Sequence, residues 1–102
     1  MITKERIAEL TKQFGETEKD TGNSRVQVAI LSDKIKYLTE HLKTHKKDSH
    51  SRRGMRLMLG KRSSLLKHMK VVTLKTEKSH PESKALENYK EFLNTLGLKD
   101  RY

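Results

Sequence analysis

The fold of this chain is decided by residues 24–42, which read SRVQVAILSDKIKYLTEHL. Apolar side chains recur there at alternating intervals of three and four residues, which is the spacing of one face of an α-helix. These positions are Val28, Leu31, Ile35, Leu38 and Leu42. Ser24 is followed three residues later by Gln27, a capping-box pattern that predicts the helix start. Because the stripe lasts barely two heptads, we expect it to pack inside the chain's own bundle and not in an intermolecular coiled coil.

The same spacing predicts a helix near each end of the chain. The first runs over residues 4–14, where the Thr3 hydroxyl can accept an orphan backbone N–H and Gly15 ends the helix. The fourth begins around Pro81, because proline suits the first turn of a helix, and ends in a Schellman motif at Gly97. The apolar positions of the two helices are Ile7, Leu10, Phe14, Leu86, Tyr89, Leu93 and Leu96, with Phe92 a further candidate.

A third helix is expected from about Ser51 to Val72. Its inward side chains would be Met55, Met58, Leu59, Leu65, Leu66 and Met69. Residues 73–80 are polar and aperiodic, so we predict a loop there. Strand-like alternation is absent, and four helices with short connections indicate an all-α bundle in one domain, residues 1–102, with a loosely attached first helix.

Composition limits the classes of function. The chain has 102 residues, of which 32% are hydrophobic and 35% charged, so its core must be thin and an enclosed catalytic cavity is not expected. Its net charge of +10 favours a polyanionic partner, either nucleic acid or an anionic membrane surface. The absence of cysteine excludes disulfides and thiolate metal sites. No apolar run approaches membrane-spanning length, and the N-terminus lacks a signal-peptide pattern.

The charge is concentrated in residues 41–54, which read HLKTHKKDSHSRRG. Eight Lys or Arg lie between residues 43 and 62, with Asp48 as the only acid, and three of the five histidines lie in the quoted stretch. Such a cluster can contact several phosphates at once and release their counterions. A charge run is often only a solvated turn, but the density of this one and its histidines and hydroxyls favour nucleic-acid binding.

Asp48 is the most informative residue of this segment. A carboxylate weakens simple phosphate binding, but it can accept a hydrogen bond from a base amino group or a 2′-hydroxyl. Ser51 and His41 can make similar contacts, and the shallow minor groove of A-form RNA presents both kinds of donor. The alternative is that Asp48 and Ser51 only cap the third helix, and the sequence leaves both interpretations open.

Catalytic and membrane functions fit the sequence less well. His41 and His45 have the i, i+4 spacing of a metal site, which His50 and Asp48 could complete, but no Glu follows His41 and the nearby cations oppose a metal ion. No Gly-rich phosphate loop, serine elbow or paired-carboxylate motif is present, so we expect neither an enzyme nor a cofactor. The fourth helix is amphipathic, yet its polar face is mixed in charge, unlike a membrane-surface helix.

Several motifs resemble those of the bacterial-type small-subunit ribosomal protein S15 family. They are FG at 14–15, DTGNS at 20–24, VQVA at 26–29, HLKTHKKDSHSRRG at 41–54, LL at 65–66 and LGL at 96–98. The match covers nearly the whole chain in order. It implies four helices, three packed as a bundle and the first more mobile, and a primary binder of small-subunit ribosomal RNA that organises the central domain during assembly.

The resemblance implies two RNA contacts. The loop between the second and third helices enters an RNA minor groove, where His41, Asp48 and Ser51 match the family's contacts. The full set that we expect at this groove is His41, His45, Lys46, Lys47, Asp48, His50, Ser51, Arg52 and Arg53. A second surface holds a three-way junction. The residues expected there are Thr21, Gly22, Ser24, Gln27, Ser64 and His68.

The chain departs from the family pattern near the end of the third helix. The family has there an Arg-rich stretch, then a Tyr and then another basic residue, and this chain has Ser63, Ser64, His68 and Val71 instead, so the junction site carries over only in part. About a dozen residues, roughly 71–83, form an extended loop or an insertion that could instead lengthen the third helix.

The resemblance also implies partners. They are small-subunit ribosomal RNA, other small-subunit proteins and, through an intersubunit bridge, large-subunit ribosomal RNA. No membrane and no small-molecule substrate are expected, and the location would be the ribosome of the cytoplasm or of an organelle. A stand-alone helical RNA-binding module outside the ribosome is the alternative.

Overall fold

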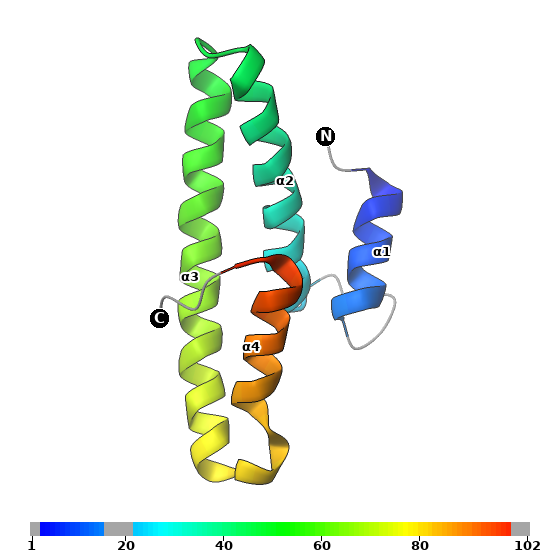
Figure 1. The fold of residues 1–102 in the computed structure, drawn as a ribbon, viewed down its shortest axis with the longest axis vertical. Coiled ribbons are helices and arrows are strands. Elements are labelled where there is room, and N and C mark those ends of the chain that lie inside the picture. Colours follow the sequence, from blue (N-terminus) through cyan, green and yellow to red (C-terminus); the bar gives the residue numbers. More distant parts are fainter. Residues whose placement is uncertain (1–2, 16–21, 99–102) are drawn as a thin grey trace. The chain divides into compact units, whose positions relative to one another are not determined.

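The computed structural model describes residues 3–15 and 22–98, except the side chain of Ser83. These residues form four α-helices and one short 3-10 helix, with no strand (Figure 1). The elements are α1 (Lys4–Phe14), α2 (Ser24–Thr44), α3 (Ser49–Ser79), η1 (Pro81–Ser83) and α4 (Ala85–Leu96). The predicted all-α class is confirmed, while the greater mobility expected of α1 stays a prediction.

The starts of the first two helices follow from local capping. Thr3 caps α1 as predicted, because its hydroxyl accepts a hydrogen bond from the backbone N–H of Arg6 at 3.2 Å. In α2 the predicted cap is wrong by one residue. Asn23 is the N-cap, its side-chain oxygen accepting from the N–H of Arg25 at 2.9 Å, so Ser24 is already the first helical residue. Asparagine is as good a cap as serine, and it comes first along the chain.

The loop predicted for residues 73–80 is wrong, because α3 continues without a break to Ser79. The stretch lacks apolar periodicity, but two of its polar side chains make hydrogen bonds within the helical structure. The Thr76 hydroxyl donates to the carbonyl of Val72 at 2.9 Å, and the Glu77 carboxylate accepts from the N–H of Leu86 in α4 at 3.2 Å. No Gly or Pro lies between Gly60 and Pro81 to break the helix there.

The last helix begins later than predicted. Pro81 opens the 3-10 helix η1, and α4 starts at Ala85 because Lys84 adopts the left-handed conformation with φ 53°. The predicted Schellman ending is confirmed. Gly97 has φ 71°, its N–H donates to the carbonyl of Asn94 at 3.1 Å, and the N–H of Leu98 donates to that of Leu93 at 2.9 Å.

The chain forms two compact units, Met1–Ser63 and Ser64–Tyr102. In the first unit α1 packs against α2. Arg6 of α1 also forms an ion pair with Asp33 of α2, with 2.6 Å between Nε and Oδ2. The buried apolar residues are Leu10, Val26, Val28, Ala29, Ile30, Leu31, Ile35 and Leu42. The apolar face of α2 is therefore wider than the predicted stripe. Every member of that stripe is buried except Leu38, which is half-buried.

In the second unit, the later half of α3 packs beside α4 (Figure 1). Leu66, Tyr89, Phe92 and Leu93 are buried. The Tyr89 hydroxyl donates to the carbonyl of Leu66 at 3.4 Å, so the ring's polar end is satisfied inside this interior. Among the described residues, no helix is both long and apolar enough to cross a membrane.

Candidate nucleic-acid interface

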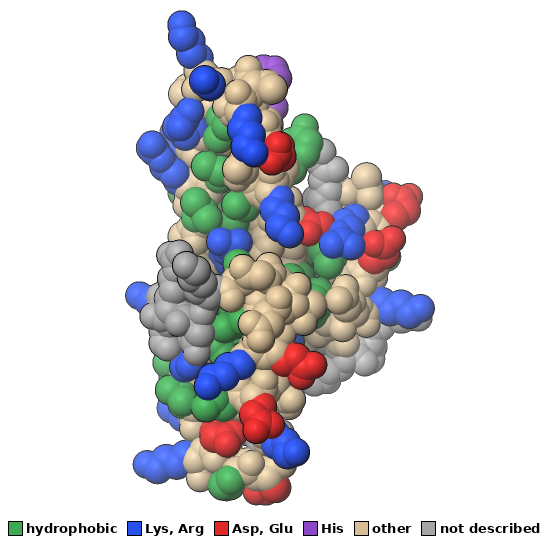
Figure 2. Space-filling model, viewed as in Figure 1, with side chains coloured by type: hydrophobic (Ala, Val, Ile, Leu, Met, Phe, Trp, Pro, Cys, Tyr) green, Lys and Arg blue, Asp and Glu red, His purple; other side chains and the backbone are tan. Residues whose placement is uncertain are grey.

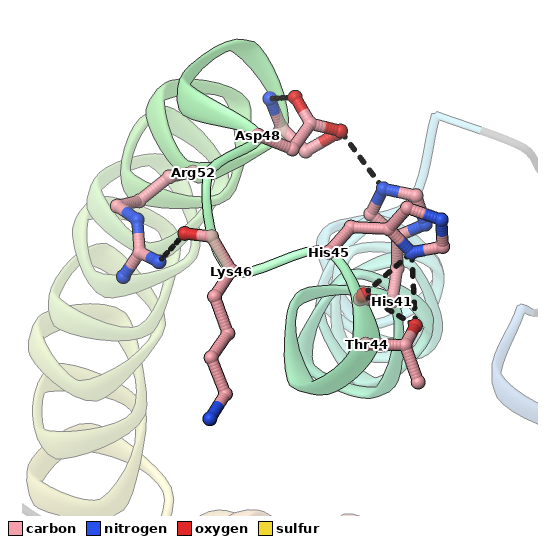
Figure 3. A network of polar contacts seen from close by, with 7 residues as sticks. His41, Thr44, His45, Lys46, Asp48 and Arg52 are labelled. Carbon is pink, nitrogen blue, oxygen red and sulfur yellow. Dashed lines mark hydrogen bonds and ion pairs between the residues drawn. The ribbon is translucent and has the colours of Figure 1, made fainter.

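The basic segment of residues 41–54 spans the end of α2, the turn of residues 45–48 and the start of α3, and Figure 3 shows this turn. The last turn of α2 closes with the N–H of His45 donating to the carbonyl of His41 at 2.9 Å. The N–H of Asp48 then donates to the carbonyl of His45 at 3.1 Å. Asp48 therefore lies directly before α3, facing the end of α2.

Asp48 accepts three hydrogen bonds from protein groups. Its Oδ1 accepts from the backbone N–H of Ser51 at 3.0 Å, which makes Asp48 the N-cap of α3. Its Oδ2 accepts from the Ser51 hydroxyl at 2.7 Å and from Nε2 of His41 at 2.8 Å. Figure 3 shows the last of these bonds joining the start of α3 to α2. The proposed capping role of Asp48 is thus confirmed, and Ser51 is its partner and not a separate cap.

The two hydrogen bonds from Ser51, together with that from His41, hold the pKa of the Asp48 carboxyl well below its ordinary value of 3.8. Asp48 is therefore ionised at neutral pH and can only accept hydrogen bonds. It follows that Nε2 of His41 carries a proton. The carboxylate also lies at the positive end of the α3 dipole, which favours its charged form.

The histidines of α2 are stacked. The rings of His41 and His45 are nearly parallel, 5° apart, with centroids 4.3 Å from each other. Tyr37, one turn earlier, continues the column with its centroid 6.3 Å from that of His41. Nδ1 of His45 lies 2.8 Å from the Thr44 hydroxyl and 3.2 Å from the carbonyl of His41. We call His41, Thr44, His45, Asp48 and Ser51 the loop network.

The loop network is only partly covered. The side chains of His41 and Asp48 keep 26% and 30% of their surface exposed. Ser51 is likewise half-buried, while Thr44 and His45 are exposed. A ligand can therefore touch groups whose positions the chain has already fixed.

Cations surround this network, and Figure 2 shows Lys and Arg side chains projecting beside the histidines at this turn. Arg52 is held in place, because its Nη2 donates to the carbonyl of Lys46 at 2.8 Å. Lys46, Lys47 and Arg53 are exposed, and their side chains make no ion pair with a described residue. His50 is exposed as well. These groups can meet phosphates without first giving up a partner.

The structure therefore brings the predicted minor-groove residues together at one turn. The sequence interpretation missed Thr44 and Tyr37, although the i, i+4 spacing of Tyr37, His41 and His45 was a visible signal for the stack. Across residues 3–15 and 22–98, no three His, Asp or Glu side chains are placed to hold a metal ion.

The predicted junction residues divide between the two units. Thr21 lies outside the described residues. Gly22 is exposed just before α2, where Ser24 and Gln27 are half-buried. Ser64 and His68 are exposed one turn apart on α3, in the second unit. Their role as one binding surface stays a prediction.

Comparison with known proteins gives a consistent result. Residues 7–99 match the family model described as Ribosomal protein S15. The chain is also 46% identical, over 94 residues, to the small ribosomal subunit protein uS15 of Heliobacterium modesticaldum, and the match covers 92% of each chain.

Proposed function

This chain belongs to the ribosomal protein S15 family, and from that premise we propose that it binds small-subunit ribosomal RNA through the α2–α3 turn and a second, junction-binding surface. Its family makes it a constituent of the small ribosomal subunit with a structural and not an enzymatic role. The observation that carries the proposal is the loop network, in which a carboxylate is fixed among cations and left partly exposed.

The loop network offers hydrogen-bond acceptors in fixed positions. The three donors around Asp48 leave Oδ1 with one unused lone pair, and the Ser51 oxygen can also still accept. The minor groove of A-form RNA presents the matching donors, which are 2′-hydroxyls and the amino group of guanine. A phosphate, which has no proton to donate at neutral pH, is repelled by the same carboxylate. The network therefore favours contact with the groove over contact with the backbone.

The surrounding cations supply affinity. Lys46, Lys47 and Arg53 can each approach a phosphate and so fix the position of the loop along the RNA. If six or more phosphates are contacted in total, binding falls roughly a thousandfold or more between 50 and 200 mM salt. The cations of this turn would thus provide most of the affinity, while Asp48 and Ser51 would recognise the groove.

The second arm of the proposal is the three-way junction. Thr21, Gly22, Ser24, Gln27, Ser64 and His68 are its proposed contacts. Binding at both arms would fix the angle between two RNA helices, which prepares the central domain for later proteins. The proposed assembly partners are other small-subunit proteins and, across an intersubunit bridge, large-subunit RNA.

The test compares binding of the chain to a small-subunit RNA three-way junction and to a plain RNA duplex over a salt series. We expect a preference for the junction that persists as salt rises, because hydrogen bonds in a groove release few counterions. Equal and equally salt-sensitive binding to both RNAs would contradict the proposal and favour a generic RNA-binding module.

Asp48 is the residue whose loss should most change the preference among RNAs. Replacing it in Asp48→Ala removes the acceptor that holds His41 and Ser51, so the preference for the junction should fall about tenfold or more. Affinity for the plain duplex should fall less, because its minor groove offers the same donors but no second arm holds the loop at one position along it. The matched control is Glu91→Ala, which removes one exposed acid from α4. If both variants keep the wild-type preference, the groove-reading role of the loop network is wrong.

A further inference from the structure

The later part of α3 has a face that the proposed contacts do not use. Helix α3 spans 31 residues and contains nine Lys or Arg but a single acid, Glu77. Residues 71–79, which the sequence predicted in large part as a loop, continue the helix beyond Ser64 and His68. We call residues 71–79 the α3 extension.

The two sides of the α3 extension differ in chemistry. Thr73, Thr76 and Glu77 are half-buried. Glu77 is occupied on that side, since its carboxylate accepts from the N–H of Leu86 at 3.2 Å and so satisfies an orphan donor at the start of α4. The single acid of α3 is therefore not available to neutralise the opposite side.

The opposite side is exposed and basic. Val71, Lys75 and Lys78 follow one another at i, i+4 and i+7, which places them on one helix face. Lys75 and Lys78 are exposed, and among the described residues neither has an ion-pair partner. Val71 and Leu74 are 50% and 49% exposed. We call these four residues the outer face of the α3 extension.

We infer that the outer face of the α3 extension binds the phosphodiester backbone of ribosomal RNA. This inference rests on the proposed RNA-binding function and extends it to residues beyond the junction contacts. His68 precedes Lys75 by seven residues, two turns of helix, so it lies on the same face as Lys75 and Lys78. An RNA strand held at His68 would pass Lys75 and Lys78 within about 15 Å along the helix.

The lysines of the α3 extension also compensate for the cations that the junction site lacks. Ser63, Ser64 and Val71 stand where the resemblance leads us to expect basic residues, and each removes a possible phosphate contact. Lys75 and Lys78 restore two cations on the same helix. The exposed apolar side chains of Val71 and Leu74 also fit a protein partner. The lysines beside them, with no acid on this face, favour RNA.

The test measures the salt dependence of binding to a three-way-junction RNA whose arms are each at least one helical turn long. The variant is Lys75→Ala with Lys78→Ala, and the control is Lys12→Ala with Lys90→Ala, which removes the same charge from exposed positions of α1 and α4. Alanine favours helix at all four positions, so folding should be preserved, and circular dichroism checks this. The expected result is a slope of log affinity against log salt that is shallower by about 2 in the variant, for two lost contacts, with affinity about tenfold lower at 0.1 M salt.

Three outcomes would overturn the inference. One is an unchanged slope in the Lys75/Lys78 variant, and another is an equal change in the control. The third is normal binding to the RNA with poor incorporation into small subunits, which would assign the outer face to a protein partner. Rescue of the slope by Lys75→Arg with Lys78→Arg would support phosphate contact. If the wild-type chain itself shows no preference for the junction, the proposed function fails, while the slope difference between variant and control still decides the inference on any RNA.

Discussion

The loop network and the outer face of the α3 extension are both polar surfaces of a basic chain, but they differ in how their groups are held. Asp48 of the network accepts hydrogen bonds of 2.7, 2.8 and 3.0 Å from groups of the chain itself. Lys75 and Lys78 of the extension are exposed and lack an ion-pair partner among the described residues. The acceptor of the first region is fixed before RNA arrives, whereas the ammonium groups of the second have no ion pair among the described residues to give up.

This difference separates specificity from affinity. A fixed acceptor costs little further ordering on binding and rewards only a donor in the matching position. A flexible ammonium group can meet a phosphate in many positions, so it adds attraction that salt screens and that carries no sequence information. We therefore expect changes in the network to alter preference among RNAs, and changes in the extension to alter affinity for all of them.

The largest loss of RNA affinity should come from removing Lys46 and Lys47. They lie in the loop, but they are exposed cations like Lys75 and Lys78 of the extension. In Lys46→Ala with Lys47→Ala, two exposed cations are lost, so binding to junction and duplex RNA should weaken alike, by about tenfold or more at 0.1 M salt. The ratio of the two affinities should not change. The measurement is the same salt series, with Lys12→Ala and Lys90→Ala as the control. A changed ratio of the two affinities would mean that these lysines contribute to the choice of RNA. The location of a side chain in the loop would then matter more than whether hydrogen bonds fix it.

Much of the fold could be predicted from the sequence, where local interactions decide it. The bounds of α1 follow from the Thr3 cap and Gly15, and the end of α4 follows from the Gly97 motif. The α3 extension was misread because its helix does not depend on an apolar stripe. Its Glu77 carboxylate accepts a hydrogen bond from the start of α4, and no local pattern reveals a partner nine residues away.

The candidate site was predictable in composition but not in geometry. The density of cations located the turn, and the family motifs named its residues. The sequence left open whether Asp48 caps α3 or contacts RNA, because a hydrogen bond to His41 depends on how closely α3 turns back on α2. The structure shows that one carboxylate caps the helix and remains partly exposed, so the two roles are compatible.

The next prediction distinguishes two roles of His41, which are stacking on His45 and the hydrogen bond to Asp48. His41→Phe keeps an aromatic ring to stack on His45 but loses the donor to Asp48, whereas His41→Gln keeps a donor and loses the ring. A hydrogen bond to a charged group contributes about 1.5 kcal/mol or more, so His41→Phe should lower the junction preference roughly tenfold. His41→Gln should lower it less. Competition binding with labelled junction RNA and unlabelled duplex measures the ratio directly.

The control for this pair is Tyr37→Phe. It keeps the ring at the far end of the stack and removes only a hydroxyl from a half-exposed side chain. Its preference should equal that of the wild type. A stronger loss in His41→Gln than in His41→Phe would instead make stacking the decisive contribution of this residue, and would weaken the contrast between a fixed acceptor and free cations.

The smallest effect is a dependence of stability on pH that the loop network should show and the extension should not. Folding lowers the pKa of Asp48 below its ordinary value of 3.8, so its carboxylate stabilises the folded chain above that pH, and this contribution is lost as the pH falls through the lower pKa of the folded state. Asp48→Asn can still cap α3, so the variant should be only slightly less stable near neutral pH. In urea unfolding, the gap in stability between wild type and Asp48→Asn should still be present at about pH 5 and should close in more acid solution. Because every other carboxylate is common to both chains, a gap that persists in acid would mean that the charge of Asp48 does not hold the turn together, and the network would then be fixed by shape alone.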